Sequence, residues 1–325
     1  MGSVPIIDVG ALLDPSADPA PVAAELDRAC RDVGFFVAVG HGVAQAKLDA
    51  LLDAARRFFA RPEDEKAEIA MPKAGRAWRG WFPLGGELTS GMPDGKEGIY
   101  FGEELPPDDR MLHGPNLFPV RPPELRTTVL EWMDAMTGLG HVLMGGLALG
   151  LGLERDWIDR HLTAEPVTLF RIFRYPPADR SPNEDWGVAE HTDYGLLTIL
   201  ADDGTPGLQV RTRDGWIDID PVPGGFVCNL GDMLERMTAG RYRSTPHRVR
   251  PPVGDDDRLS FPFFFDPGWD VEVGPLPIEG AAPADGATDR WDHASVHEWS
   301  GTYGDYLTNK VRKVFPGLEA RDSGP

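Results

Sequence analysis

Hydrophobic residues in the first 165 positions recur mainly at helical spacing. Between Asp18-Pro19 and Gly34, apolar side chains occur every three or four residues, which predicts a helix ending near Gly34. The apolar run at 35–39 then predicts a short buried strand. Two further stripes, at 48–59 and from 122 to about 149, predict amphipathic helices.

The second half of the chain consists of short apolar segments separated by turn residues. Strands at such regular spacing predict an antiparallel sandwich or jelly roll. Periodicity is absent from 71–98, which predicts a long loop and a candidate substrate lid. A last amphipathic stretch at 303–314 predicts a C-terminal helix. The predicted strands cover 167–175, 196–201, 208–210, 216–219, 226–230, 247–250 and 259–265.

These patterns predict an α+β, mainly β protein with one domain over 1–325. Residues 1–165 are expected to form a mainly helical N-terminal layer and residues 166–270 the β-core. Residues 271–325 are expected to form a C-terminal loop and helix. No internal repeat or interdomain linker interrupts this plan.

Charge and composition narrow the classes of partner. The chain carries 32 Lys and Arg against 52 Asp and Glu, so its formal net charge is −20. Such a surface repels phosphate backbones and anionic headgroups, and we expect no nucleic-acid or membrane partner. The longest apolar stretch, 142–153, is shorter than the roughly 18–20 residues that cross a bilayer. The N-terminus lacks a signal-peptide pattern, so a cytoplasmic protein is expected. No obligate protein partner is inferred.

The two cysteines, Cys30 and Cys228, each lie in an apolar run and are predicted to be buried free thiols. Any metal would therefore be bound by histidines and carboxylates. His191 and Asp193 are the first candidates, because side chains at i and i+2 of an extended segment point the same way. His247 follows 54 residues after Asp193. Two histidines and one carboxylate leave open metal positions, as in non-heme Fe(II) oxygenases.

A candidate anion site follows His247 by eleven residues. Alternation places Arg258 and Ser260 on one face of an otherwise apolar strand, where a guanidinium and a hydroxyl can bind one carboxylate. A buried arginine needs an anion, and a small dicarboxylate reaching from the metal would supply it. The alternative is a structural ion pair with an acidic residue of the chain.

The ordered motifs of the chain resemble the isopenicillin N synthase-like branch of the Fe(II)/2-oxoglutarate-dependent oxygenases. The resemblance implies a double-stranded β-helix (jelly-roll) core flanked by N-terminal and C-terminal helices. The matching motifs include 4–8, 34–36 with 41–43, 79–81, 94–97, 175–176, 191–193, 229–232, 244–249 and 258–260.

The resemblance also implies the cofactors and their ligands. It assigns Fe(II) to His191, Asp193 and His247, with 2-oxoglutarate chelating the metal and Arg258 and Ser260 binding its distal carboxylate. Tyr175 matches a tyrosine that contacts the cosubstrate in many relatives, although packing at a strand end is its alternative role. The expected enzyme is a non-heme Fe(II)/2-oxoglutarate-dependent dioxygenase that uses O2 to oxidise an unactivated C–H bond of a small molecule. Succinate and CO2 are then released.

The outcome of this oxidation stays open between several reactions. Hydroxylation is the commonest in the family, and desaturation, cyclisation or ethylene formation are alternatives. Two other functions also remain: a same-fold oxidase that does not use 2-oxoglutarate in the usual way, and a non-catalytic metal-binding jelly-roll protein. The identity of the substrate and the oligomeric state cannot be read from the residues.

Three residues are candidates for substrate contact. Arg171 and Arg174 are three apart on a predicted strand, so alternation places them on unlike faces and one can face the cavity. An anionic substrate group is the expected partner, and a solvated surface role is the alternative. Trp81 lies in the expected lid loop and is the third candidate, with a purely structural role as the alternative.

Overall fold

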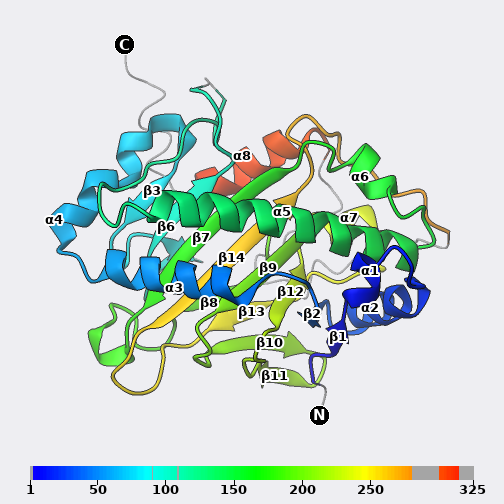
Figure 1. Cartoon of the computed structure of the whole chain (residues 1–325), viewed down its shortest axis with the longest axis horizontal. Helices are drawn as coiled ribbons and strands as arrows, with labels where there is room; N and C mark the ends of the chain where they lie inside the picture. Colours follow the sequence, from blue (N-terminus) through cyan, green and yellow to red (C-terminus); the bar gives the residue numbers. More distant parts are fainter. Residues whose placement is uncertain (1–2, 90, 108–109, 280–299, 315–325) are drawn as a thin grey trace.

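Two β-sheets pack face to face in the computed structural model, which describes residues 3–89, 91–107, 110–279 and 300–314. The larger sheet has eight strands in the order β1-β2-β12-β9-β14-β7-β6-β3, and the smaller has four in the order β11-β10-β13-β8. A buried apolar cluster joins them, with Phe173 and Tyr175 from the larger sheet and Val188 and Val249 from the smaller. The predicted jelly-roll core is therefore confirmed (Figure 1).

The strands are short and mostly antiparallel; only the pairing of β1 with β2 is parallel in the part of the large sheet described. They are β1 (Ile6–Asp8), β2 (Phe35–Val39), β3 (Gly80–Phe82), β4 (Leu88–Thr89), β5 (Met92–Pro93), β6 (Glu97–Gly102), β7 (Val167–Tyr175), β8 (Val188–His191), β9 (Leu197–Asp202), β10 (Leu208–Thr212), β11 (Gly215–Asp218), β12 (Phe226–Leu230), β13 (His247–Val249) and β14 (Arg258–Asp266).

Helices cover the outer face of the large sheet, with α5 lying across it (Figure 1). The helices are α1 (Gly10–Leu13), α2 (Ala20–Asp32), α3 (Gln45–Phe59), α4 (Glu63–Lys66), α5 (Leu125–Gly150), α6 (Trp157–His161), α7 (Asp232–Met237) and α8 (Tyr303–Val314). Three short 3-10 turns cover Ala67–Ile69, Met71–Ala77 and Ala178–Arg180. Among the described residues, no helix is long and apolar enough to span a membrane.

Alternation along the central strands separates a core face from a cavity face. On β14, Phe261 and Phe263 pack into the core beneath the helices, whereas Arg258 and Ser260 line a cavity between the sheets. On β9, Thr198 and Leu200 face the same cavity. Because side chains of a strand alternate, the same short segments build both the core and the site.

The structure divides the chain differently from the sequence expectation in two places. The expected loop at 71–98 contains β3 and the start of β6, which pair with each other and extend the large sheet beyond β7. Strand β2 comes from the expected helical layer but lies beside β12 of the core. These pairings are non-local, so local periodicity does not reveal them. Residues 280–299 and 315–325 of the expected C-terminal segment lie outside the described residues.

Candidate active site

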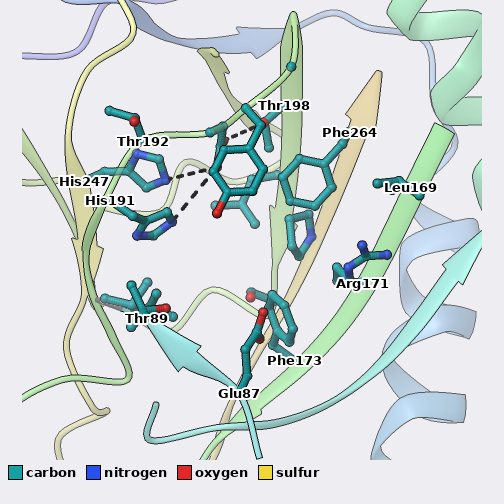
Figure 2. A pocket seen from close by; sticks show the side chains of 18 of the residues that line it. Glu87, Thr89, Leu169, Arg171, Phe173, His191, Thr192, Thr198, His247 and Phe264 are labelled. Carbon is teal, nitrogen blue, oxygen red and sulfur yellow. Dashed lines mark hydrogen bonds and ion pairs between the residues drawn. The ribbon is translucent and has the colours of Figure 1, made fainter. Parts of the chain in front are cut away.

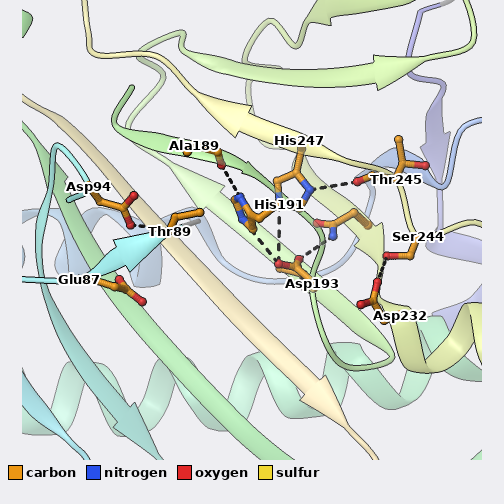
Figure 3. Close-up of polar contacts among 12 residues, drawn as sticks. Glu87, Thr89, Asp94, Ala189, His191, Asp193, Asp232, Ser244, Thr245 and His247 are labelled. Atoms are coloured by element: carbon orange, nitrogen blue, oxygen red, sulfur yellow. Dashed lines mark hydrogen bonds and ion pairs between the residues drawn. The ribbon is translucent and has the colours of Figure 1, made fainter. Parts of the chain in front are cut away.

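Two neighbouring strands of the small sheet bring the candidate metal ligands together. His191 ends β8 and His247 begins β13, and the two residues are direct partners in the strand pairing. Asp193 Oδ1 lies 4.0 Å from His191 Nε2 and 3.7 Å from His247 Nε2. One ligand atom from each of the three residues lies within 4.8 Å of the others. The predicted grouping of the three residues is thus present (Figure 3).

Asp193 lies between two strands rather than within one. The strand ends at His191, and Asp193 lies in the turn before β9. The Asp193 carbonyl accepts a hydrogen bond from the Asp232 amide at 2.7 Å, so the turn is held by the first residue of α7. The Asp193 side chain nevertheless lies on the same side as His191, as expected from their i, i+2 spacing, and reaches the site.

Hydrogen bonds at Nδ1 orient the two histidine rings so that the Nε2 atom of each is available to bind a metal. His191 Nδ1 lies 2.8 Å from the Ala189 carbonyl, and His247 Nδ1 lies 3.1 Å from the Thr245 carbonyl. When both Nδ1 atoms donate, each Nε2 has a free lone pair. Figure 3 shows these bonds, with both rings turned toward Asp193.

The Asp193 carboxylate is oriented in the same way. Its Oδ2 accepts hydrogen bonds of 2.6 Å from Thr198 Oγ1 and from Asn229 Nδ2, which leaves Oδ1 toward the histidines. Sequence reasoning treated Asn229 as a scaffold residue and missed Thr198. The available signal was a buried amide within the apolar strand 226–230, which requires a polar partner.

Protonation states suit a divalent cation. Burial and the neighbouring His191 lower the pKa of His247 to about 4, and burial also lowers the pKa of His191. Burial alone would raise the pKa of Asp193, but the two histidines and the bonds from Thr198 and Asn229 lower it below its usual value. Neutral imidazoles and an ionised carboxylate are the forms that bind metal. The donor set therefore fits Fe(II).

The candidate 2-oxoglutarate residues lie together in the same cavity. Arg258 is 1% exposed, and its Nε donates to the Thr205 carbonyl at 3.0 Å. Its Nη2 forms an ion pair with Asp202 at 3.9 Å, whereas its Nη1 is buried with no hydrogen-bond partner among the described residues. Ser260 Oγ lies 3.5 Å from the Tyr175 hydroxyl. The unsatisfied Nη1 of this buried guanidinium, beside two hydroxyls, fits a bound carboxylate.

The cavity has a volume of about 220 Å³ and lies between the two sheets. Figure 2 shows His191 and His247 on one side, Arg171 on the opposite side and the Phe173 ring near the bottom. Leu307 of α8 also lines the cavity, so the C-terminal helix contributes to its wall.

Only some of the substrate candidates line this cavity. Arg171 does, whereas Arg174 points to the other face of β7 and forms ion pairs with Glu97 at 2.5 Å and Asp257 at 2.6 Å. Trp81 also lies outside the lining, and its Nε1 donates to Glu97 at 2.9 Å. The neighbouring Trp78 lines the cavity instead. The Arg174 and Trp81 side chains therefore take part in packing away from the cavity.

A buried ionic cluster that sequence reasoning missed forms part of the cavity wall. Lys96 lies between Glu87, at 2.9 Å, and Asp94. Tyr100 donates a hydrogen bond to Glu87, and its ring lies 3.5 Å from the guanidinium carbon of Arg171. Burial alone would lower the pKa of Lys96, but the two acids raise it above its usual value. Their charges stabilise the buried ammonium.

Comparison with known proteins identifies the family. Residues 4–121 match the description "non-haem dioxygenase in morphine synthesis N-terminal", and residues 166–267 match "2OG-Fe(II) oxygenase superfamily". A probable iron/ascorbate oxidoreductase of Dictyostelium discoideum is 43% identical over 92% of this chain and 90% of its own. The chain belongs to the 2OG-Fe(II) oxygenase superfamily.

Other similar proteins match nearly the whole chain. A homoarginine-6-hydroxylase of Arabidopsis thaliana is 34% identical and covers 96% of this chain and 98% of its own. A 2OG-Fe(II) oxygenase family protein of Caulobacter crescentus has 30% identity and a TM-score of 0.79, covering 96% of this chain and 99% of its own. A Neurospora crassa protein solved with alpha-KG and 5-formyluracil is 24% identical, with a TM-score of 0.79 over 96% of both chains, and shares the fold.

These findings confirm the resemblance to the isopenicillin N synthase-like branch and the predicted fold class. This oxygenase is a non-heme Fe(II)/2-oxoglutarate-dependent dioxygenase, and its cofactors are Fe(II), 2-oxoglutarate and O2.

Proposed function

We propose that this oxygenase oxidises an unactivated C–H bond of a small molecule by hydroxylation and releases succinate and CO2. The observation that carries this proposal is the pairing of two incomplete sites in one cavity. Three ligand atoms converge within 4.8 Å, and Arg258 Nη1 has no partner among the described residues. Iron and a dicarboxylate would complete both sites.

His191, Asp193 and His247 would hold the iron, which when bound supplies O2 activation coupled to oxidative decarboxylation of 2-oxoglutarate. Thr198 and Asn229 hold the Asp193 carboxylate so that the same oxygen always faces the metal position. Such supporting bonds orient a ligand and raise metal affinity.

Arg258, Ser260 and Tyr175 would bind the distal carboxylate of 2-oxoglutarate. Burial raises the pKa of Tyr175, so its phenol remains a hydrogen-bond donor at neutral pH. Arg258 would supply the charge, and its contact with Thr205 fixes the direction of the guanidinium. The apolar walls of the cavity, including Phe173 and Phe264, would keep water away from the substrate.

The relatives support a small substrate. The homoarginine-6-hydroxylases and the 1-aminocyclopropane-1-carboxylate oxidases are named for acting on amino acids, and the Neurospora crassa protein was also solved with thymine. A cavity of about 220 Å³ is below the usual range for drug-sized ligands, and it must also hold 2-oxoglutarate. We therefore propose compounds of amino-acid size as substrates.

A same-fold oxidase that does not use 2-oxoglutarate in the usual way is the second candidate. Two Dictyostelium 1-aminocyclopropane-1-carboxylate oxidases are 33% identical to this chain over 99% of it. The unpartnered Arg258 Nη1 favours 2-oxoglutarate use. The oxidoreductase relatives leave the non-catalytic alternative without support.

The test measures succinate formation and O2 uptake by purified protein with Fe(II), with and without 2-oxoglutarate. We expect both to depend on 2-oxoglutarate, and anaerobic mixing with Fe(II) and 2-oxoglutarate to produce a visible charge-transfer band. His247→Ala should lose the band and the succinate, whereas His161→Ala, on the exposed surface of α6, should keep both. O2 uptake at the same rate with and without 2-oxoglutarate would favour the oxidase instead.

A further inference from the structure

Arg171 differs from the other cations that surround the cavity. Its side chain extends into the cavity from β7, opposite the histidines (Figure 2). Its two hydrogen bonds to backbone, to the Phe101 and Phe170 carbonyls at 3.1 Å, both leave from Nη1. A guanidinium has five N–H groups, which is more than these two carbonyls and the side chain of Tyr100 accept.

The charge of Arg171 is not balanced by a direct ion pair. Within the described part of the chain, no carboxylate forms an ion pair with it at 4.0 Å or less, and its neighbour Tyr100 is a buried phenol whose pKa is raised, so it is uncharged. Glu87 and Asp266 act on it only from longer range. Burial lowers the pKa of Arg171 below its usual value. The Tyr100 ring stabilises the cation in part, but it carries no negative charge, and a buried cation without an adjacent anion is more favourable when a ligand supplies one.

The neighbouring cations already have their anions. Lys96 is bound by Glu87 and Asp94, and Arg174 by Glu97 and Asp257. Arg258 lies in the part of the cavity assigned to 2-oxoglutarate. Among the cations of the described cavity wall, Arg171 is therefore the one available to bind a second anion besides 2-oxoglutarate.

We propose that Arg171 binds a carboxylate of the substrate, so that this oxygenase acts on small carboxylic acids and discriminates against their neutral analogues. The assignment rests on the proposed function, because it places the substrate across the cavity from the metal ligands. Leu169 and Phe264 flank Arg171 and offer apolar contact to the substrate carbon chain (Figure 2).

Calorimetric titration of the Fe(II)- and 2-oxoglutarate-loaded protein under nitrogen tests this proposal without turnover. The probes are L-homoarginine, 1-aminocyclopropane-1-carboxylate, the carboxamide of each, and thymine, which has no carboxylate. We expect at least one acid to bind about tenfold or more tightly than its carboxamide and thymine. This comparison uses the wild-type protein and so does not depend on the folding of a variant.

Arg171→Gln should weaken binding of the preferred acid by about 30-fold or more, because a desolvated charge pair is lost. Arg171→Lys should bind with intermediate affinity, since it keeps the charge but loses the bidentate geometry. Arg174→Gln is the matched control on the same strand, and it should bind the acid within about twofold of wild type because Arg174 lies outside the cavity lining.

Acids that bind no better than thymine would overturn the proposal, as would Arg171→Gln with wild-type affinity for the preferred acid. Succinate formation without substrate, measured in parallel, reports on the proposed function separately. Substrate-free succinate formation together with equal binding of acids and carboxamides would reject the role of Arg171 alone. Tight, Arg171-dependent binding of an acid without any consumption of 2-oxoglutarate would instead reject the oxygenase reaction.

Discussion

Replacing Arg258 by Gln tests the 2-oxoglutarate site most directly. Arg258 is 1% exposed and its Nη1 lacks a partner among the described residues, so the bound dicarboxylate would form its main charge contact. Losing one member of a buried charge pair costs about 2–5 kcal/mol. At about 1.4 kcal/mol per tenfold change, the Kd for 2-oxoglutarate should rise by about 30-fold or more.

Thermal or urea unfolding of the metal-loaded protein can measure this change without turnover. At a 2-oxoglutarate concentration of about 100 times the wild-type Kd, the ligand stabilises the wild type by about 2.7 kcal/mol. A variant with 100-fold weaker binding would gain only about 0.4 kcal/mol at that concentration. Arg211→Gln is the control, because Arg211 is 49% exposed and paired with Glu190 at the surface. Equal stabilisation of wild type and Arg258→Gln would refute the assignment.

Three further predictions follow from local contacts. Asn229→Ala removes a 2.6 Å bond to the Asp193 carboxylate and should weaken Fe(II) affinity by about 10–100-fold in anaerobic titration, with unchanged affinity contradicting its positioning role. Burial raises the pKa of Asp266 to about 7, above the unfolded value of 3.8. The protonated carboxyl therefore stabilises the folded state at low pH, and this contribution is lost as the pH rises from about 4 to 7. Urea unfolding should therefore show a decline of up to about 1.4 kcal/mol per pH unit relative to Asp266→Asn, and parallel pH profiles would reject this origin. Gly138→Ala, on α5 where an added Cβ meets no atom within 4 Å, should raise the free energy of unfolding by about 1 kcal/mol, and a lower melting temperature would contradict this.

The residues that could be recognised in the sequence are those whose role depends on local spacing. Arg258 and Ser260 share a strand face because they are two apart, and the structure places both in the cavity. The helix that ends near Gly34 could also be predicted from the sequence, because apolar periodicity and a terminal glycine are local signals. His191 and His247 were grouped by their donor types and then by the family resemblance, and strand pairing places them side by side.

Tertiary structure alone decided which residues face the substrate. Alternation showed that Arg171 and Arg174 point to unlike faces, but only the pairing of β7 with β14 in the folded sheet determined which of those faces borders the cavity. The contact of Asn229 with Asp193 joins residues 36 apart in sequence and depends on how β12 packs beside β9. Side-chain spacing along one strand is set by backbone geometry, whereas the partner of a buried polar group is set by elements that are distant in the chain. The sequence by itself therefore determined the donor types and the class of chemistry, and the fold determined their neighbours and the shape of the cavity.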